Sequence, residues 1–366
     1  MKVAIIGAGF AGLTCAYELE KYGIKPVLYE KNNFIGEAYE HVTAILEIVH
    51  RPIKDIVDYL NQDLGIYLKP VNPVDTLIHN SPNNRAIMKG NFGYFYKRGR
   101  EKTSVKNQLF SKLKNTKVIL NEMADYKKLS KKYDHVVVAT GNPNFTEELG
   151  CWQEWFVSME KVAVVTGDFN PKAIVMWINN DYAKNGYAYL APFNEKKAYI
   201  IMVLPCVTEE QIDPYWNVFL NTENIKYKII EEYNLKHNAG LVYPHRVQNI
   251  HFAGAAGGGI DPFLGFGQLN AIKTGIMTAR SIVKGKNYEK LIKKVIKNNE
   301  YSYEFRKAFN RMSNKDYDIL INLLDLPIIK QLIYNTQINV LKLGGEFLTK
   351  LNKRYEIKES NKKSFY

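Results

Sequence analysis

Three glycines near the start of the chain have the spacing of a turn that binds phosphate. Gly7, Gly9 and Gly12 form G-x-G-x-x-G directly after the apolar run 3–6, and apolar residues at helical spacing follow. In this pattern the first glycine permits a tight turn, the second lets the backbone approach a pyrophosphate, and the third lets the helix pack against the strand. The start of the helix adds free N–H groups and the positive end of its dipole. These residues therefore predict dinucleotide binding.

An acidic residue stands where a bound ribose would need one. The second apolar run, 27–29, ends at Glu30, about 20 residues beyond the glycines, which is the usual distance for an acid that accepts hydrogen bonds from the ribose hydroxyls. Its charge disfavours a 2′-phosphate, so NADP is not expected at this site. The alternative is a glycine-rich turn without a ligand.

A second glycine cluster lies much later in the chain. Residues 251–275 contain seven of the 24 glycines, with large apolar residues among them, which argues against a flexible surface loop. Gly265 and Gly267 precede a helical pattern, so a helix is expected to begin near Gln268. We expect the backbone here to lie against a ligand, with a second helix N-terminus directed at it.

These motifs, in order along the chain, resemble those of the flavoprotein superfamily of para-hydroxybenzoate hydroxylase type, and most of all its geranylgeranyl reductase family. YDHVVVATG (133–141) resembles the family's ATG signature, in which the strand end passes close to FAD. GYAYLAPFNEKKAYIIMV (186–203) resembles the Y-x-W-x-F-P motif of the substrate domain. NIHFAGAAGGGIDPFLGFGQLNAI (249–272) resembles the GDAAG…P…GxG motif. The resemblance runs from residue 1 to about 285.

The resemblance implies that FAD is the cofactor, and it implies which residues contact it. In this family a basic residue before a helix reaches the flavin, and Lys102 is the closest positional match, with Arg98 and Arg100 nearby. The family's GDAAG aspartate falls on Gly254, which removes one hydrogen bond to FAD, and Tyr189 stands where the family has tryptophan. The expected FAD contacts are Gly7, Ala8, Gly9, Ala11, Gly12, Glu30, Lys31, Lys102, Ala124, Ala139, Thr140, Gly141, Gly254, Pro262, Gly265, Gly267 and Gln268.

The fold implied by the resemblance is α/β, with a Rossmann-like FAD-binding domain of GR2 type, an inserted antiparallel-sheet substrate domain and a C-terminal helical segment. The FAD-binding domain is expected at 1–80, 95–145 and 240–285, the substrate domain at 81–94 and 146–239, and the helical basic region at 286–366. Because the connections between apolar runs in the substrate domain are too short for crossover helices, antiparallel pairing is favoured. The strands expected there are 161–166, 173–178, 187–191 and 198–204.

Candidate catalytic residues are fewer and less distinctive. Tyr187 and Tyr189 are expected either to line an apolar substrate pocket or to be ordinary sheet core. His50 lies in the segment after Glu30, which in such proteins folds back over the flavin, and it could protonate a substrate carbanion. The alternative for His50 is a structural hydrogen bond. The sequence shows no Ser/His/Asp or paired-carboxylate arrangement, and a flavin would not need one because the cofactor carries the hydride.

The reaction that the resemblance implies is reduction of carbon–carbon double bonds in an isoprenoid, polyprenyl or similar apolar substrate by hydride transfer from reduced flavin. Two alternatives stay open. One is a flavin-dependent monooxygenase of hydroxylase or halogenase type that uses NAD(P)H and O2, and the other is a flavin-binding redox sensor with little turnover. No second G-x-G-x-x-G follows a strand. Electrons are therefore expected from NAD(P)H that docks transiently or from a carrier such as ferredoxin.

The net charge of +13 is unevenly distributed, since residues from Lys284 onward contain 18 Lys and Arg against 9 Asp and Glu. This basic region is expected to form either a helical cap with a solvated face or an amphipathic element on an anionic membrane surface. It lacks the aromatic–basic interleaving of nucleic-acid binders. The three cysteines lack metal-ligand spacing, and no signal peptide or membrane span is recognised. A cytoplasmic enzyme, peripheral on the inner face of the membrane in the second case, is the expectation.

Overall fold

The first layer of the molecule is a six-stranded sheet. The computed structural model describes residues 1–363, with side chains through Glu356. The strand order is β13-β14-β7-β1-β2-β6, and every neighbouring pair is parallel except β13 with β14. All four residues of the central strand β1 are buried, as expected for a wholly apolar run covered on both faces. The strands are β1 (Val3–Ile6), β2 (Val27–Tyr29), β6 (Lys117–Ile119), β7 (His135–Val138), β13 (Arg246–Val247) and β14 (Ile250–Phe252).

Two helices from opposite ends of the chain pack together on this sheet. Helix α1 (Phe10–Lys21) follows the first glycine motif, and α8 (Gln268–Lys284) begins where the second motif ends, as expected. A Cβ on Gly275 would lie 2.2 Å from the carbonyl oxygen of Ala11, so the two helices are in close backbone contact. The short helices α3 (Val105–Phe110), α4 (Tyr126–Ser130) and α5 (Asn144–Glu148) complete this domain.

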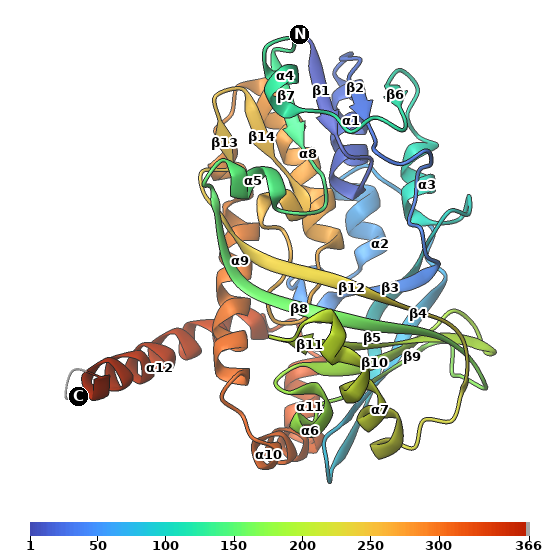
Figure 1. Cartoon of the computed structure of the whole chain (residues 1–366), viewed down its shortest axis with the longest axis vertical. Helices are drawn as coiled ribbons and strands as arrows, with labels where there is room; N and C mark the ends of the chain where they lie inside the picture. The colour runs from blue at the N-terminus through green and yellow to red at the C-terminus, as the bar shows by residue number, and fades with distance from the viewer. Residues whose placement is uncertain (364–366) are drawn as a thin grey trace.

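A second, eight-stranded sheet lies beside the first domain, with its long strands β8 and β12 curving across the molecule (Figure 1). Its order is β12-β8-β11-β10-β9-β4-β5-β3, and the β4–β9 pair is parallel while the others are antiparallel. The strands are β3 (His41–Leu46), β4 (Asn72–Asn80), β5 (Arg85–Arg98), β8 (Trp152–Thr166), β9 (Ala173–Trp177), β10 (Tyr187–Pro192), β11 (Lys197–Pro205) and β12 (Lys228–Val242).

The composition of this second sheet differs from the expected domain boundaries. The four expected strands are present, and they pair antiparallel. However, β3 and β4, which the boundaries placed in the FAD-binding domain, belong to the second sheet because β3 pairs with β5, and β4 pairs with β5 and β9. Strand β12 was not expected, since its first half is charged and exposed along the edge of the sheet.

The two faces of the second sheet have different partners. One face packs against α6 (Asn180–Ala183) and α7 (Ile212–Thr222), with Trp216 and Phe219 in the shared core. The other face includes Tyr187 and packs against Phe263 and Phe266 of the second glycine motif. The second face therefore meets the first domain at the loop that precedes α8.

Four helices follow the first domain: α9 (Tyr288–Phe309), α10 (Asn314–Asp325), α11 (Pro327–Tyr334) and α12 (Val340–Lys363). Figure 1 shows α12 extending away from the body of the molecule. Pro327 begins α11, whereas α12 continues through Gly344 and Gly345. Glycine is needed at these two positions because a Cβ there would collide with Phe305 and Tyr301 on α9. Within the described residues, no helix combines the length and apolarity needed to cross a membrane.

Candidate active site

The first glycine motif brings β1, β7 and α1 into backbone contact. Gly7 has φ +103°, and a Cβ there would lie 2.4 Å from the carbonyl oxygen of Ala139 at the end of β7. A Cβ on Gly12 would lie 1.9 Å from the carbonyl oxygen of Gly7. Both positions therefore require glycine for packing. At Gly9 the nearest atom to such a Cβ is 3.9 Å away, so the space in front of this residue is open.

The surroundings of Gly9 fit a dinucleotide. Gly9 is the N-cap of α1 and supplies no side-chain cap, and the first turn of the helix contains no acid. The N–H groups and the positive dipole end are thus available to phosphate oxygens. At the end of β2 the Glu30 carboxylate accepts hydrogen bonds of 2.9 Å from the backbone N–H groups of Ala8 and Asn32. This acid is held beside the turn, where it can bind ribose hydroxyls.

A second uncapped helix N-terminus lies at the other end of the same site. The N-cap of α8 is Gly267, which has no side chain that could cap the helix, and the first turn again contains no acid. Gln268 Nε2 donates a 2.7 Å hydrogen bond to Thr43 Oγ1 on β3, so this helix end is fixed to the second sheet. An extended cofactor with phosphates at α1 can place an electron-rich ring at α8.

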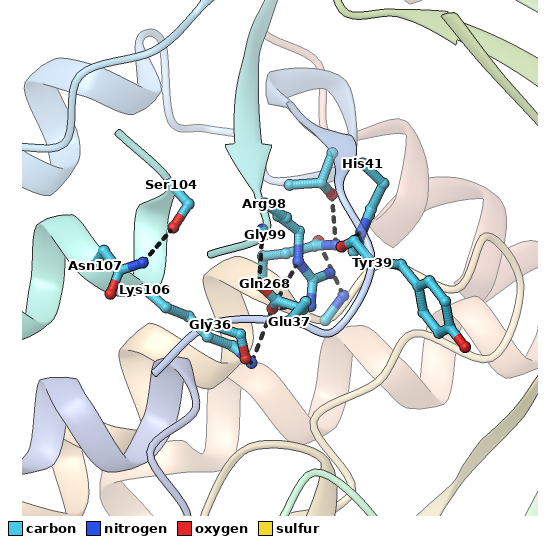
Figure 2. Close-up of polar contacts among 12 residues, drawn as sticks. Gly36, Glu37, Tyr39, His41, Arg98, Gly99, Ser104, Lys106, Asn107 and Gln268 are labelled. Carbon is cyan, nitrogen blue, oxygen red and sulfur yellow. Dashed lines mark hydrogen bonds and ion pairs between the residues drawn. The ribbon is translucent and has the colours of Figure 1, made fainter. Parts of the chain in front are cut away.

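Close to Gln268 at the start of α8 lies a half-buried ionic cluster formed by Glu37, Arg98 and Lys106 (Figure 2). Glu37 Oε1 lies 2.7 Å from Arg98 Nη2 and 2.8 Å from Lys106 Nζ, and Oε2 accepts from Gly99 N. Burial alone would raise the pKa of Glu37, but the charges of Arg98 and Lys106 outweigh it and lower this pKa to about 2. Nearby, burial and then the Arg98 charge lower the pKa of His41 to about 3, so this imidazole is neutral.

The basic residue that points toward the first glycine motif is Arg98. Its guanidinium carbon lies 5.2 Å from the centre of the Phe10 ring at the start of α1. Lys102 and Lys31, both expected to contact the cofactor, are exposed in the turns after β5 and β2. The structure therefore does not bring Lys102 into the cluster of Figure 2, where Arg98 and Lys106 stand instead. Ala124, Ala139 and Pro262 are buried, while Thr140 and Gly141 follow β7 at the sheet edge.

Gly254, which stands where the motif that it resembles has an aspartate, packs closely against α1. Gly254 has φ +64°, and a Cβ there would lie 2.9 Å from Ala11 Cβ. An aspartate would be strained and crowded at this position, so the local backbone and its packing against α1 require glycine here. Its N–H donates to Thr274 Oγ1 at 3.0 Å, which ties the loop to α8.

Tyr187 joins the second glycine motif to the second sheet. Its hydroxyl donates a 2.8 Å hydrogen bond to the carbonyl oxygen of Leu264. A Cβ on Gly265, which has φ +72°, would lie 3.5 Å from this hydroxyl. The Tyr187 and Tyr189 rings are 6.1 Å apart, and Tyr189 lies 5.9 Å from Tyr199 on the neighbouring strand. Burial, with charged or ionisable neighbours, raises the pKa of Tyr187 and Tyr189, so both hydroxyls stay protonated.

Two polar residues of this face were missed in the sequence. His237 on β12 has its Cε1 atom 3.3 Å from the ideal Cβ position of Gly265, and its Nδ1 lies 3.8 Å from Glu160 Oε1 on β8. Both side chains are largely buried, with 21% and 16% of their surface exposed. The signal for them in the sequence is the alternation of inward-facing and outward-facing residues along β12. This strand was not expected because many of its residues are charged and exposed.

His50 lies at a different place. It lines a cavity between the segment after β3 and helices α8 and α9, together with Lys273. Burial and the Lys273 charge lower the pKa of His50 to about 3, so its ring is neutral. His50, Tyr187 and Tyr189 were the candidate catalytic residues, but the structure places His50 in this cavity and not beside the two tyrosines.

Comparison with known proteins agrees with this geometry. Residues 1–154 match the family described as pyridine nucleotide-disulphide oxidoreductase. The whole chain is similar to a geranylgeranyl bacteriochlorophyll reductase-like protein from Thermoplasma acidophilum, with 19% identity, TM-score 0.74, and coverage of 95% of this chain and 98% of that one. It is also similar to the flavin-dependent brominase Bmp2 (14%, TM-score 0.67, 98% and 100% covered). A flavoprotein/dehydrogenase from Cytophaga hutchinsonii matches at 13% identity and TM-score 0.65, with 98% and 100% covered.

The chain thus has the same fold as these proteins, in agreement with the fold that its motifs implied. The open space at Gly9, the acid at Glu30 and the two uncapped helix ends are the features of this structure that fit FAD.

Proposed function

We propose that this chain reduces carbon–carbon double bonds of an isoprenoid or similarly apolar substrate. The observation that supports this most is the wall opposite Gly265, which consists of tyrosine rings and aliphatic side chains on one face of the second sheet. Such a surface excludes water and offers little to a polar substrate. The similarity to a geranylgeranyl reductase-like protein is consistent with it.

The residues near Gly265 have separate roles in this proposal. When bound and reduced, FAD supplies the hydride. Tyr187, fixed to the Leu264 carbonyl, holds the loop against the sheet, and Tyr189 and Tyr199 line the apolar wall. His237 supplies the proton that completes the reduction, and the Glu160 carboxylate lies 3.8 Å from its Nδ1. One hydride and one proton then add across the double bond.

A second candidate is a monooxygenase or halogenase. It is favoured by the similarity of the whole chain to the brominase Bmp2 and to CmlS, a flavin-dependent halogenase, at TM-scores of 0.67 and 0.65. The same apolar wall would then protect a reactive oxygen species from water. The two reactions differ in their need for O2, which makes them separable by experiment.

The electron donor in this proposal is NAD(P)H that docks transiently or a small carrier such as ferredoxin. The C-terminal helices would bring the enzyme to an anionic membrane that holds its substrate. Large apolar side chains are exposed there, including Ile328 (81%) and Phe347 (66%), and Lys330, Lys342 and Lys350 are on the same helices. Apolar insertion together with lysine attraction to anionic lipid is sufficient for reversible binding.

The test uses purified protein loaded with FAD and reduced with dithionite under anaerobic conditions. A geranylgeranyl lipid is added, and saturation of its double bonds is followed by mass spectrometry. We expect saturated product without O2. If turnover requires O2 and yields hydroxylated or halogenated product, the monooxygenase replaces the reductase.

A further inference from the structure

A cavity separate from the tyrosine wall lies between helices α8 and α9 and the segment 50–63. Its volume is about 480 Å³, which is within the usual range for a small-ligand site. Asn270, Lys273 and Met277 of α8 line it, whereas a different stripe of α8, at Ala271 and Gly275, packs toward α1. The cavity is therefore on another side of this helix from the first glycine motif.

The cationic groups in this cavity have few partners. Lys273 is partly buried, and among the side chains that the structure describes it forms no ion pair with a carboxylate. Its Nζ lies 5.0 Å from the centre of the Tyr59 ring. Lys294 of α9 lines the same cavity, and burial followed by the Lys294 charge lowers the pKa of Lys273 to about 8. Two lysines that repel each other would both gain from an anion between them.

The acids of the cavity do not take this role. Asp55 is occupied, since Oδ1 accepts from Asp58 N and Oδ2 accepts from the Tyr94 hydroxyl at 2.6 Å. Asp58 and Asp63 are exposed at the rim. The neutral ring of His50 adds a potential donor close to Lys273.

The rest of the wall is apolar. Ile53, Met277, Leu291 and Val295 are half-buried and line the cavity. We propose that this cavity is a binding site for an amphiphilic anion, with an oxyanion head at Lys273, Lys294 and His50 and an apolar body along these four side chains. Phosphorylated and carboxylated amphiphiles share this chemistry, and the proposal is independent of the reaction at the tyrosine wall.

The test is isothermal titration calorimetry of FAD-loaded protein with dodecyl phosphate and with dodecanoate below their micelle concentrations. Inorganic phosphate and dodecanol are the controls for head and body. We expect one or both amphiphiles to bind at one site while each control binds at least about 10-fold more weakly. The stronger amphiphile identifies the head group.

Variants locate the site. Lys273→Met and, separately, Lys294→Met should each weaken binding about 10- to 100-fold, since a hydrogen bond to a charged group is lost. Lys293→Met, an exposed neighbour on α9, should leave binding unchanged. Because an anion raises the pKa of Lys273, binding near pH 8 should also take up protons from the buffer. Dodecanol binding as tightly as dodecyl phosphate, or affinity unchanged in both lysine variants, would overturn the proposal.

Discussion

The two sheets of this molecule contribute to the proposed active site in different ways. The first sheet does so with backbone: Gly7, Gly9 and Gly12 and two helix ends without caps. The second sheet does so with side chains, of which His237 and Glu160 come from two strands far apart in the sequence. A backbone site imposes its residue types in one short stretch, whereas a side-chain site depends on which strands pair.

The largest effect should come from filling the backbone site. Gly12→Ala places a Cβ 1.9 Å from the Gly7 carbonyl oxygen, so α1 must move away from β1. We expect protein without FAD, or insoluble protein, judged by the absorbance of the purified fraction near 450 nm. The matched control is Gly150→Ala, where φ is +68° and a Cβ meets no atom within 4 Å. It should cost about 1–2 kcal/mol and keep FAD.

Substitutions at His237 and Glu160 should change the turnover rate and leave cofactor binding unaffected. We expect His237→Gln and Glu160→Gln each to lower turnover about 10²- to 10⁴-fold, because the general acid or its carboxylate partner is lost. The flavin spectrum should stay unchanged. Lys236→Gln, the exposed neighbour on β12, is the control. Equal rates in all three variants would show that the proton comes from elsewhere.

The ionic cluster where the two regions meet should make stability depend on acid. The pKa of Glu37 is lowered from 4.5 to about 2 in the folded chain, so its contribution is complete above pH 4.5 and is lost as the pH falls toward 2. This amounts to about 3 kcal/mol. Urea unfolding at pH 6 and pH 3 should show about two thirds of this loss, because pH 3 is still above the folded-state pKa, and Glu37→Gln should reduce the difference. Glu195→Gln, an exposed control, should show the same loss as the unchanged protein.

The smallest effect concerns the single hydrogen bond between Tyr187 and the Leu264 carbonyl. Tyr187→Phe should cost about 1 kcal/mol of unfolding free energy, since the ring packing is kept and one neutral hydrogen bond is lost. Tyr227→Phe, at an exposed ring, should cost less than half of that in the same urea titration. A loss of several kcal/mol in Tyr187→Phe would contradict this prediction, because it would exceed the contribution of one neutral hydrogen bond.

The backbone features of the first sheet could be predicted from the sequence better than the side-chain arrangement of the second sheet. The first glycine motif, Glu30, the start of α8 and the antiparallel strands from 161 to 204 were predicted because each is a local pattern. The membership of β3 and β4 in the second sheet could not be, because it depends on their pairing with β5 and β9. Lys102 was selected by position, but the fold of the β5–α3 turn leaves it exposed and places Arg98 beside Glu37.

One feature of the first sheet affects how the chain is synthesised. β7 ends at Val138, and its partner β14 begins only at Ile250, after the strands β8 to β12 of the second sheet. A ribosome adds about 5–20 residues per second, so one edge of β7 waits on the order of 10 s for its partner. During that interval β7 has an unpaired edge of backbone N–H and C=O groups, and the apolar side chains that α8 covers in the complete fold remain exposed. This is the stage of synthesis at which a chaperone would have most to protect.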